Sequence, residues 1–263
     1  MSEYLLSTSG LTKQFGHHKA VNNVDLHVKK GAIYGFIGRN GAGKTTFLKM
    51  ISGLSKPTDG EIQMFGYRNE ELKNVRSRIS CLIEAPGIYG NMSAYHNLAI
   101  KCRLFGINDS KYIENILKIV GLSEVGKKKT KHFSLGMKQR LGIGLALVGE
   151  PDLLVLDEPI NGLDPQGIAE IRDMLLRLKE EQNMTIIISS HILEELSKIA
   201  THYGIIHNGS LIQELTREEL MTRCSERMEL TLDDPKAALP ILDQMGFTNY
   251  QVVNQSTIIF MRG

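Results

Sequence analysis

A glycine-rich stretch, GRNGAGKT at residues 38–45, contains the residue types that bind phosphate groups. Its glycines let the backbone turn tightly, so that successive N–H groups can surround a phosphate. The Lys44 ammonium can neutralise phosphate oxygens, and the Thr45 hydroxyl can bind Mg²⁺. The spacing matches G-x-x-x-x-G-K-[ST], which is typical of nucleoside triphosphate sites. We therefore expect the phosphates to be bound by Gly38, Asn40, Gly41, Ala42, Gly43, Lys44, Thr45 and Thr46.

The flanking residues distinguish a phosphate site from a glycine-rich turn without a ligand. The apolar run IYGFI precedes the stretch and predicts a strand, and TFLKMISG follows it with helical character. A helix that begins at the loop directs its free N–H groups and the positive end of its dipole toward an anion. This order of strand, loop and helix favours the phosphate site.

Two adjacent acids form a second chemical element, in LLVLDEP at 153–159. The four apolar residues predict a buried strand, and the carboxyl ends of parallel strands meet at one edge of a sheet. We expect Asp157 to hold Mg²⁺ and Glu158 to polarise the water that attacks the terminal phosphate. The alternative, two solvated acids at a strand end, fits poorly after so apolar a run.

A third element, FSLGMKQR at 133–140, places Ser134 and Gly136 at the predicted start of a helix. Such a start is a ready anion site, because its backbone N–H groups lack helical partners. The alternative is that Ser134 only caps the helix that follows. Taken alone, the stretch favours the cap.

Strands joined by helices must position these elements. Short apolar runs rich in Val and Ile alternate with amphipathic stretches, which predicts an α/β fold with a mainly parallel sheet. A helix is expected at 165–181, because Asp164 can cap it and Pro165 suits its first position. The predicted strands are 33–38, 153–157, 185–190 and 203–207.

Three segments depart from this alternation. The first 30 residues predict short antiparallel strands, whereas residues 88–150 follow helical spacing and predict a helical subdomain inserted into the sheet domain. After residue 215, two helix candidates and three strand-like pieces predict a small α+β extension. We therefore expect a nucleotide-binding domain at 1–215 and an accessory subdomain at 216–263.

The composition limits the choice of partners. The formal net charge of the 263 residues is +2, which is too small to indicate electrostatic binding of nucleic acid. The chain has no Trp to stack on bases. Cys81, Cys102 and Cys224 suit neither a disulfide framework nor a zinc site, and favour a reducing cytoplasm. No stretch reaches the roughly 20 apolar residues that span a bilayer, so work at a membrane would require another chain.

Taken together, these motifs resemble those of the ATP-binding-cassette (ABC) ATPases. The likeness runs over about residues 4–213, with GRNGAGKT, FSLGMKQR, LLVLDEP, NGLDP and SSHIL in the family's order. It implies the P-loop fold of ABC ATPases, with ATP and Mg²⁺ as ligands. It also implies a head-to-tail homodimer, in which the signature loop of one copy, with Ser134, Gly136 and Met137, closes over the γ-phosphate held by the other. Phe133, Leu135 and Met137 depart from the usual Leu, Gly and Gln.

The resemblance assigns roles to three further residues. Phe15 lies where the family stacks an aromatic ring on adenine, and a buried core position is its alternative. His191 would contact the γ-phosphate and the attacking water; the alternative is a helix-capping or surface histidine. Asp164 would belong to the loop that links the two sites of the dimer, and it can cap its helix at the same time.

Glu84 stands where the family generally has glutamine, between the sheet and the helical subdomain. A carboxylate there adds negative charge near the metal and could bind Mg²⁺ more strongly than an amide. In its IEAPG context it resembles the branch that serves bacitracin and lantibiotic exporters. A tolerated substitution without mechanistic effect is the alternative.

The resemblance implies the ATP-hydrolysing subunit of a bacterial exporter of antimicrobial peptides. Such a subunit would work with integral membrane permeases at the cytoplasmic face of the cell membrane, and no nucleic acid is expected as a partner. The permeases would dock on the helical subdomain near residues 85–105. Two alternatives are a soluble ABC ATPase, such as an iron–sulfur cluster assembly factor, and a nucleotide-gated scaffold, which the presence of Glu158 disfavours.

Overall fold

The computed structural model describes residues 3–223, 227–247, 250–252, 254 and 256–261. Contacts divide the chain into two units, Met1–Leu215 and Thr216–Gly263, which are described separately below. Cys224 lies outside the described residues. The first unit contains all three motifs identified above, so its architecture decides how the motifs meet.

A six-stranded sheet forms the centre of the first unit, with the strand order β10-β9-β3-β8-β7-β6. The pairings of β3 with β8 and β9, and of β7 with β6 and β8, are all parallel. Strands β7 and β8 are buried along their whole length, as expected for parallel strands covered on both faces. The strands are β3 (Ile33–Ile37), β6 (Ile79–Leu82), β7 (Leu153–Asp157), β8 (Thr185–Ser190), β9 (His202–His207) and β10 (Ser210–Thr216).

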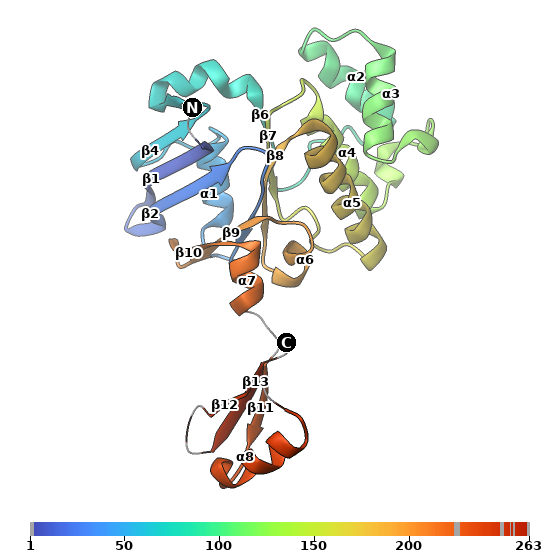
Figure 1. Ribbon diagram of the computed structural model, residues 1–263. Helices are drawn as coiled ribbons and strands as arrows, with labels where there is room; N and C mark the ends of the chain where they lie inside the picture. Colours follow the sequence, from blue (N-terminus) through green and yellow to red (C-terminus); the bar gives the residue numbers. More distant parts are fainter. Residues whose placement is uncertain (1–2, 224–226, 248–249, 253, 255, 262–263) are drawn as a thin grey trace. The chain divides into compact units, whose positions relative to one another are not determined.

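A second sheet has four strands in the order β2-β1-β4-β5, and all of its pairings are antiparallel. Helix α1 (Lys44–Ile51) packs between the two sheets (Figure 1). Its Phe47 lies against Phe36 of the central sheet, with 4.9 Å between ring centroids. The helix that follows the phosphate loop is therefore held by one continuous core. The strands are β1 (Tyr4–Phe15), β2 (His18–Lys29), β4 (Asp59–Met64) and β5 (Tyr67–Arg68).

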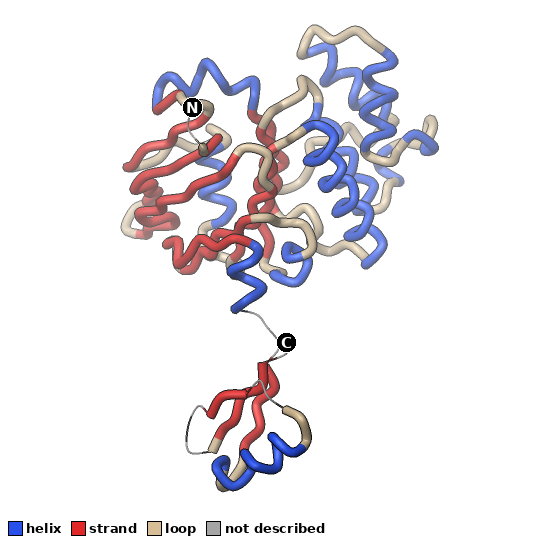
Figure 2. The backbone as a smooth tube through the Cα atoms, viewed as in Figure 1, coloured by secondary structure: helices blue, strands red, loops and turns tan. Residues whose placement is uncertain are grey.

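The segment 88–150 consists of helices joined by loops, and its only β pairing among the described residues is one isolated bridge between Ser93 and Lys129 (Figure 2). Helix α4 approaches α3 closely at Gly144, where an added Cβ would lie 3.3 Å from side-chain atoms of Ile116 and Val120. Helices α4 and α5 lie side by side (Figure 1). The α-helices of this segment are α2 (Ala94–Leu104), α3 (Ser110–Ile119) and α4 (Leu135–Leu147), and α5 (Pro165–Gln182) follows β7. The 3₁₀ helices are η1 (Asn69–Arg78), η2 (Ser123–Val125) and η3 (Thr130–His132), and α6 (Leu193–Ser197) is a short α-helix after β8.

The second unit is a small α+β structure. Its three antiparallel strands have the order β11-β13-β12, and Ile258 and Leu242 form the centre of its core. Asp234 caps α8 by accepting hydrogen bonds from two backbone N–H groups of its first turn. Its elements are α7 (Arg217–Arg223), β11 (Arg227–Thr231), α8 (Pro235–Gln244), β12 (Tyr250–Val252) and β13 (Thr257–Met261).

The predicted fold class is confirmed, because the central sheet is mainly parallel and carries the four predicted strands. Strands β6 and β10 were not predicted. Strand β6 reads ISCL and is mostly half-buried, so its Ser and Cys break the apolar run that marks a central strand. On α5, the buried side chains include Ile171, Met174, Leu175 and Leu178, which form one face of the predicted helix.

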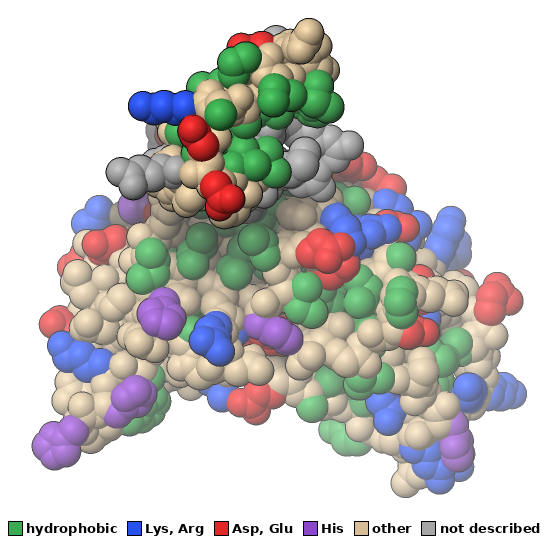
Figure 3. All heavy atoms as spheres, turned by 90° about the horizontal axis from the view of Figure 1, so that it is seen from below, with side chains coloured by type: hydrophobic (Ala, Val, Ile, Leu, Met, Phe, Trp, Pro, Cys, Tyr) green, Lys and Arg blue, Asp and Glu red, His purple; other side chains and the backbone are tan. Residues whose placement is uncertain are grey.

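On the face seen in Figure 3, acidic and basic side chains are interspersed, in keeping with the small net charge. Among the helices of the described residues, none has the length and apolar character needed to cross a bilayer.

Candidate nucleotide-binding site

The phosphate loop connects the carboxyl end of β3 to the start of α1. Gly43 has φ = 105°, and an added Cβ there would clash with the carbonyl oxygen of Ala20, so this position requires glycine. No side chain caps the start of α1 within the described residues. The N–H groups of its first turn are therefore suited to an anion. Asn40 and Gly41 are exposed at the tip of the loop, Ala42 is buried beneath it, and Thr46 is half-buried.

Lys44 is buried at the base of the loop, although it is charged. Its ammonium donates hydrogen bonds to the carbonyls of Gly38 (2.6 Å) and Arg39 (3.2 Å). It also lies 3.1 Å from Oε1 of Glu158. Carbonyl dipoles and one carboxylate thus hold a desolvated cation at the position where a phosphate would add further negative charge.

Asp157 is buried at the end of β7, where two hydroxyl groups hold its carboxylate. Thr45 donates to Oδ2 and Ser189 donates to Oδ1, each at 2.6 Å. Ser189 also accepts the backbone N–H of Glu158 at 2.9 Å. These contacts join α1, β7 and β8 at the carboxyl edge of the sheet, so Asp157 and Thr45 are brought together as the sequence predicts.

Glu158 has a left-handed backbone conformation (φ = 47°), which is uncommon for a residue with a side chain. Its Oε2 lies 2.9 Å from Nδ1 of His191, which follows β8. Its Oε1 is buried and, within the described residues, accepts no aligned hydrogen bond despite the nearby Lys44 ammonium. Such an oxygen retains the capacity to accept a proton or a water hydrogen. His191 is exposed, as the surface alternative has it, and its ring contacts the Glu158 carboxylate there.

Phe15 lies at the end of β1 with 55% of its surface exposed. The alternative of a buried core residue is therefore wrong. Its ring lies 5.2 Å from the Lys13 ammonium, a cation–π distance. An exposed aromatic ring is available for stacking on a base.

Ser134 is the N-cap of α4 and accepts a hydrogen bond from the Met137 N–H at 3.2 Å. Gly136 is in the first turn of the helix, next to the exposed Leu135, whereas Phe133 is buried. Within the part of the chain that the structure describes, no hydrogen bond or ion pair joins these residues to the phosphate loop. The helix starts at Ser134 and at the phosphate loop are thus separate elements of one chain.

Asp164 caps α5 and accepts the Gly167 N–H at 3.0 Å. Asp164 therefore caps α5 in this structure. One turn further along, Glu170 lies 3.3 Å from an Arg140 guanidinium nitrogen. Arg140 also donates to the carbonyls of Val120 (3.3 Å) and Gly121 (2.9 Å) at the end of α3. This arginine therefore ties α3, α4 and α5 together.

Glu84 does not contact Thr45 or Asp157 in this structure. Its Oε1 lies 2.6 Å from the Lys49 ammonium on α1. Its backbone is left-handed, with φ = 65°.

Comparison with known proteins agrees with this geometry. Residues 21–161 match the sequence profile of the family described as ABC transporter. The bacitracin transport ATP-binding protein BcrA of Bacillus licheniformis is 45% identical over 258 residues, which cover 97% of this chain and 84% of BcrA. This chain belongs to the ABC transporter family. It is an ATPase of that family, as the motif resemblance implies.

A second relative is the lantibiotic transport ATP-binding protein SrtF of Streptococcus pyogenes. It is 43% identical over 210 residues, which cover 80% of this chain and 90% of SrtF. Solved structures of ABC cassettes share the fold. A nucleotide-free cassette is 27% identical with a TM-score of 0.74, covering 83% of this chain and 94% of that chain. The ADP conformation of the cassette MJ1267 is 26% identical with a TM-score of 0.74, covering 92% and 99%.

Two residues around this ABC ATPase's site escape sequence reasoning: Ser189 and Lys49. Ser189 is one of two serines at the end of β8, and only the parallel pairing of Asp157 with Ser189 shows which carboxylate it holds. Lys49 is one of many surface-type lysines in the sequence. No local pattern marks its partner, because Glu84 is distant along the chain.

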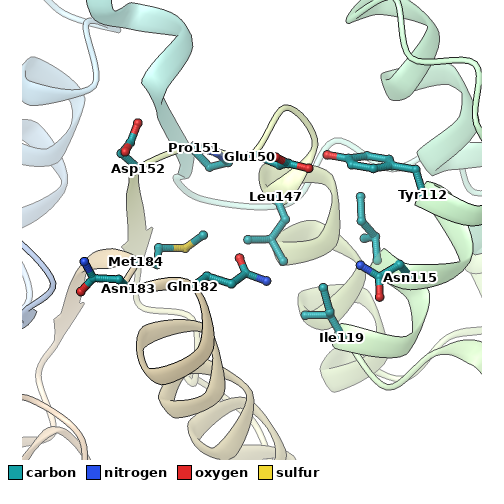
Figure 4. Close-up of a pocket in the computed structure, with 11 residues that line it drawn as sticks. Tyr112, Asn115, Ile119, Leu147, Glu150, Pro151, Asp152, Gln182, Asn183 and Met184 are labelled. Carbon is teal, nitrogen blue, oxygen red and sulfur yellow. The ribbon is translucent and has the colours of Figure 1, made fainter.

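A separate cavity of about 330 Å³ lies away from this site, at the amino ends of β7 and β8 (Figure 4). Side chains of α3, including Tyr112 and Asn115, face the loop 150–152 and the end of α5 across it. In a parallel α/β sheet the reactive edge is the carboxyl end of the strands. The cavity is therefore no part of the phosphate chemistry.

Proposed function

We propose that this chain is the ATP-hydrolysing subunit of a bacterial exporter that removes peptide antibiotics of the bacitracin or lantibiotic type. The observation that carries the proposal is the 45% identity to BcrA, which extends over 97% of this chain. Glu84 in its IEAPG context supports the same branch. A soluble assembly factor or a scaffold without hydrolysis has no comparable support.

In the proposed reaction Lys44 neutralises the β- and γ-phosphate oxygens. Glu158 polarises a water through its buried Oε1, which no aligned donor occupies among the described residues. His191, at 2.9 Å from Oε2, fixes the carboxylate and faces the γ-phosphate. Ser189 keeps Asp157 and Glu158 in register by bonding to both. The exposed ring of Phe15 stacks on adenine.

The donor set fits Mg²⁺. Asp157 and Thr45 offer a carboxylate and a hydroxyl oxygen 2.6 Å apart, and Mg²⁺ prefers oxygen ligands. Phosphate and water oxygens would complete the coordination. When bound, Mg²⁺ would neutralise charge that develops on the phosphates.

We further propose that ATP joins two copies of the chain head to tail. The helix start at Ser134 and Gly136 is separate from the phosphate loop of its own chain. In the dimer it would contact the γ-phosphate held by the other copy, with Met137 beside it. Asp164, in the loop before α5, would link the closure of one nucleotide site of the dimer to the closure of the other.

The permease partners would dock at a groove on the helical subdomain. A hollow of about 280 Å³ lies between the end of β6, the segment 86–89, α2 and α4. Ile100 and Leu104 of α2 supply apolar surface, and Lys101 supplies charge. Glu84 lies along the chain between the lining residues Leu82 and Pro86, which would couple docking to the nucleotide site. Such docking would hold the chain at the cytoplasmic face of the membrane.

The test begins with the variant Glu158→Gln. It should bind ATP, accumulate as a dimer and lose about 10²- to 10⁴-fold in hydrolysis rate, because the general base is removed. Light scattering with and without ATP measures the dimer, and phosphate release measures turnover. Glu180→Gln, on the exposed side of α5, is the matched control and should behave as the unchanged chain. Full hydrolysis by Glu158→Gln would refute the base assignment.

Export is tested in bacteria that express the chain with the permease genes encoded beside it. Resistance to bacitracin or a lantibiotic should rise with the unchanged chain and remain at background with Glu158→Gln. Recovery of the chain with membranes is expected only when permease is present. Turnover without any change in resistance, and without membrane recovery, would favour the soluble ATPase.

A further inference from the structure

Glu84 and Glu158 occupy equivalent places at the ends of neighbouring strands. Strand β6 pairs with β7 in parallel, with Leu82 opposite Leu156. Glu84 and Glu158 each follow that pair by two residues, and both have a left-handed backbone, with φ of 65° and 47°. The register therefore brings Glu84 to the same sheet edge as the proposed base, one strand further out.

Lys49 ties Glu84 to the helix that carries the proposed metal ligand. It follows Thr45 by four residues on α1, so the two side chains lie on one face about one helical turn apart. The Lys49 ammonium lies 2.6 Å from Oε1 of Glu84. The carboxylate is thus bound to a lysine one helical turn from Thr45, and it contacts neither Thr45 nor Asp157.

We propose that Lys49 is a positioning residue that competes with the nucleotide-bound metal ion for the Glu84 carboxylate. A carboxylate oxygen that is paired with an ammonium binds a second cation more weakly than a free carboxylate oxygen does. Binding of the metal with ATP would therefore transfer Glu84 from Lys49 to the metal or its waters. This exchange would shift the segment that follows β6, whose residues Pro86 and Gly87 line the proposed permease groove.

The solvent exposure of the Lys49–Glu84 ion pair sets the expected size of the competition. Lys49 and Glu84 are 37% and 66% exposed, so water screens their attraction and the pair can exchange partners readily. An exposed pair of this kind shifts an equilibrium by about two- to fivefold. With the family's usual glutamine at this position, the amide would form no ion pair with Lys49, and the competition would be absent. The inference rests on the proposed function, because it requires a metal at Asp157 and Thr45.

The experiment measures ATP binding without turnover, in chains that carry Glu158→Gln. A fluorescent ATP analogue is titrated once with EDTA and once with saturating Mg²⁺. The Kd with EDTA divided by the Kd with Mg²⁺ gives a ratio that reports how much the metal strengthens binding. Lys49→Met should raise this ratio about threefold, because it frees the Glu84 carboxylate. In a Glu84→Gln background the same lysine change should leave the ratio unchanged.

The double variant separates competition from a general loss of positive charge, which would persist without Glu84. Lys29→Met is the matched control, since Lys29 pairs with Glu3 at 2.8 Å with similar exposures of 43% and 64%. Lys29 lies before the amino end of β3, away from the phosphate loop, so Lys29→Met should not alter the ratio of the two Kd values. Thermal unfolding checks that every variant is folded.

Three results would overturn the inference. If Lys49→Met raised the ratio equally in the chain with Glu84 and in the Glu84→Gln background, Lys49 would act only through its general field. A ratio that does not change with Lys49→Met in the chain with Glu84 would show that no competition exists. A ratio near one in every chain would instead refute the proposed metal site, and the competition with it.

Discussion

The Lys44 ammonium lies 3.1 Å from Oε1 of Glu158, an ion pair that joins the loop lysine of α1 to the proposed base at the end of β7. Lys44 is only 6% exposed, and its hydrogen bonds go to backbone carbonyls of the loop. The lysine therefore positions the carboxylate as well as the loop. In the proposed mechanism, phosphate binding and water activation both depend on this one buried charge.

Replacing Lys44 should impair nucleotide binding more than folding. Lys44→Ala removes the cation that faces the phosphates, and we expect ATP affinity to fall by at least about tenfold, as for a lost charged contact. Equilibrium titration with ATP and Mg²⁺ measures the change. The exposed Lys198→Ala is the control. Unchanged ATP affinity in Lys44→Ala would count against the phosphate role.

The signature glycine should tolerate a side chain in the isolated chain but not in the ATP-bound dimer. An added Cβ at Gly136 would meet only Leu163 Cδ2, at 3.8 Å, an ordinary contact. Gly136→Ala should therefore keep or slightly raise thermal stability, since alanine favours helix. Hydrolysis should fall by about 10²-fold, because phosphate oxygens would lose close backbone approach. Wild-type turnover together with normal dimer formation would exclude this role.

Gly43→Ala provides the contrast to that variant. Its Cβ would clash with the Ala20 carbonyl, and its φ of 105° disfavours any side chain. Loss of stability is therefore expected at Gly43 and not at Gly136.

Arg140 should contribute to stability as a junction of three helices. Its guanidinium bonds to the last carbonyls of α3, where a cation is also favoured by the helix dipole, and pairs with Glu170 of α5. Arg140→Ala should lower the free energy of unfolding by about 1–3 kcal/mol. Urea unfolding measures the loss, with the exposed Arg177→Ala as control. Arg140→Lys should recover only part, because a single ammonium cannot reach both sides. Equal stability of Arg140→Ala and the unchanged chain would show that the junction is unimportant.

Tyr34 predicts an alkaline limit of stability. Its buried hydroxyl donates to Glu214 at 2.6 Å, and burial, followed by the Glu214 charge, raises the Tyr34 pKa well above its ordinary value of 10.0. The native state keeps this proton at a pH where the unfolded chain loses it. The stabilisation is therefore complete below about pH 10 and declines as the pH rises toward the native pKa.

Tyr34→Phe should cost about 1 kcal/mol near neutral pH, because the hydrogen bond to Glu214 is lost. Above pH 10 its stability should fall less steeply than that of the unchanged chain. Urea unfolding at pH 8 and pH 11 compares the two. Tyr89→Phe, at an exposed position, is the control. Parallel pH profiles for Tyr34→Phe and the unchanged chain would contradict the assignment.

The sequence predicts the strand and helix that flank the phosphate loop, because local apolar runs and glycine spacing depend on neighbouring residues alone. It also predicts the acids at the end of β7 and the helical character of residues 88–150. It does not reveal β6 as a strand, since ISCL lacks the apolar run of a central strand. Nor does it reveal Ser189, whose importance comes from a hydrogen bond to Asp157 on the neighbouring strand.

The sequence by itself therefore determined the residue types of the reaction and the order of the motifs, since spacing along the chain requires no knowledge of the fold. The tertiary structure alone decided their partners. It placed Glu158 between Lys44 and His191, and Glu84 against Lys49 rather than beside Asp157. Such pairs form between distant segments, and strand register and the packing of α1 between two sheets, which no local pattern encodes, set their distances.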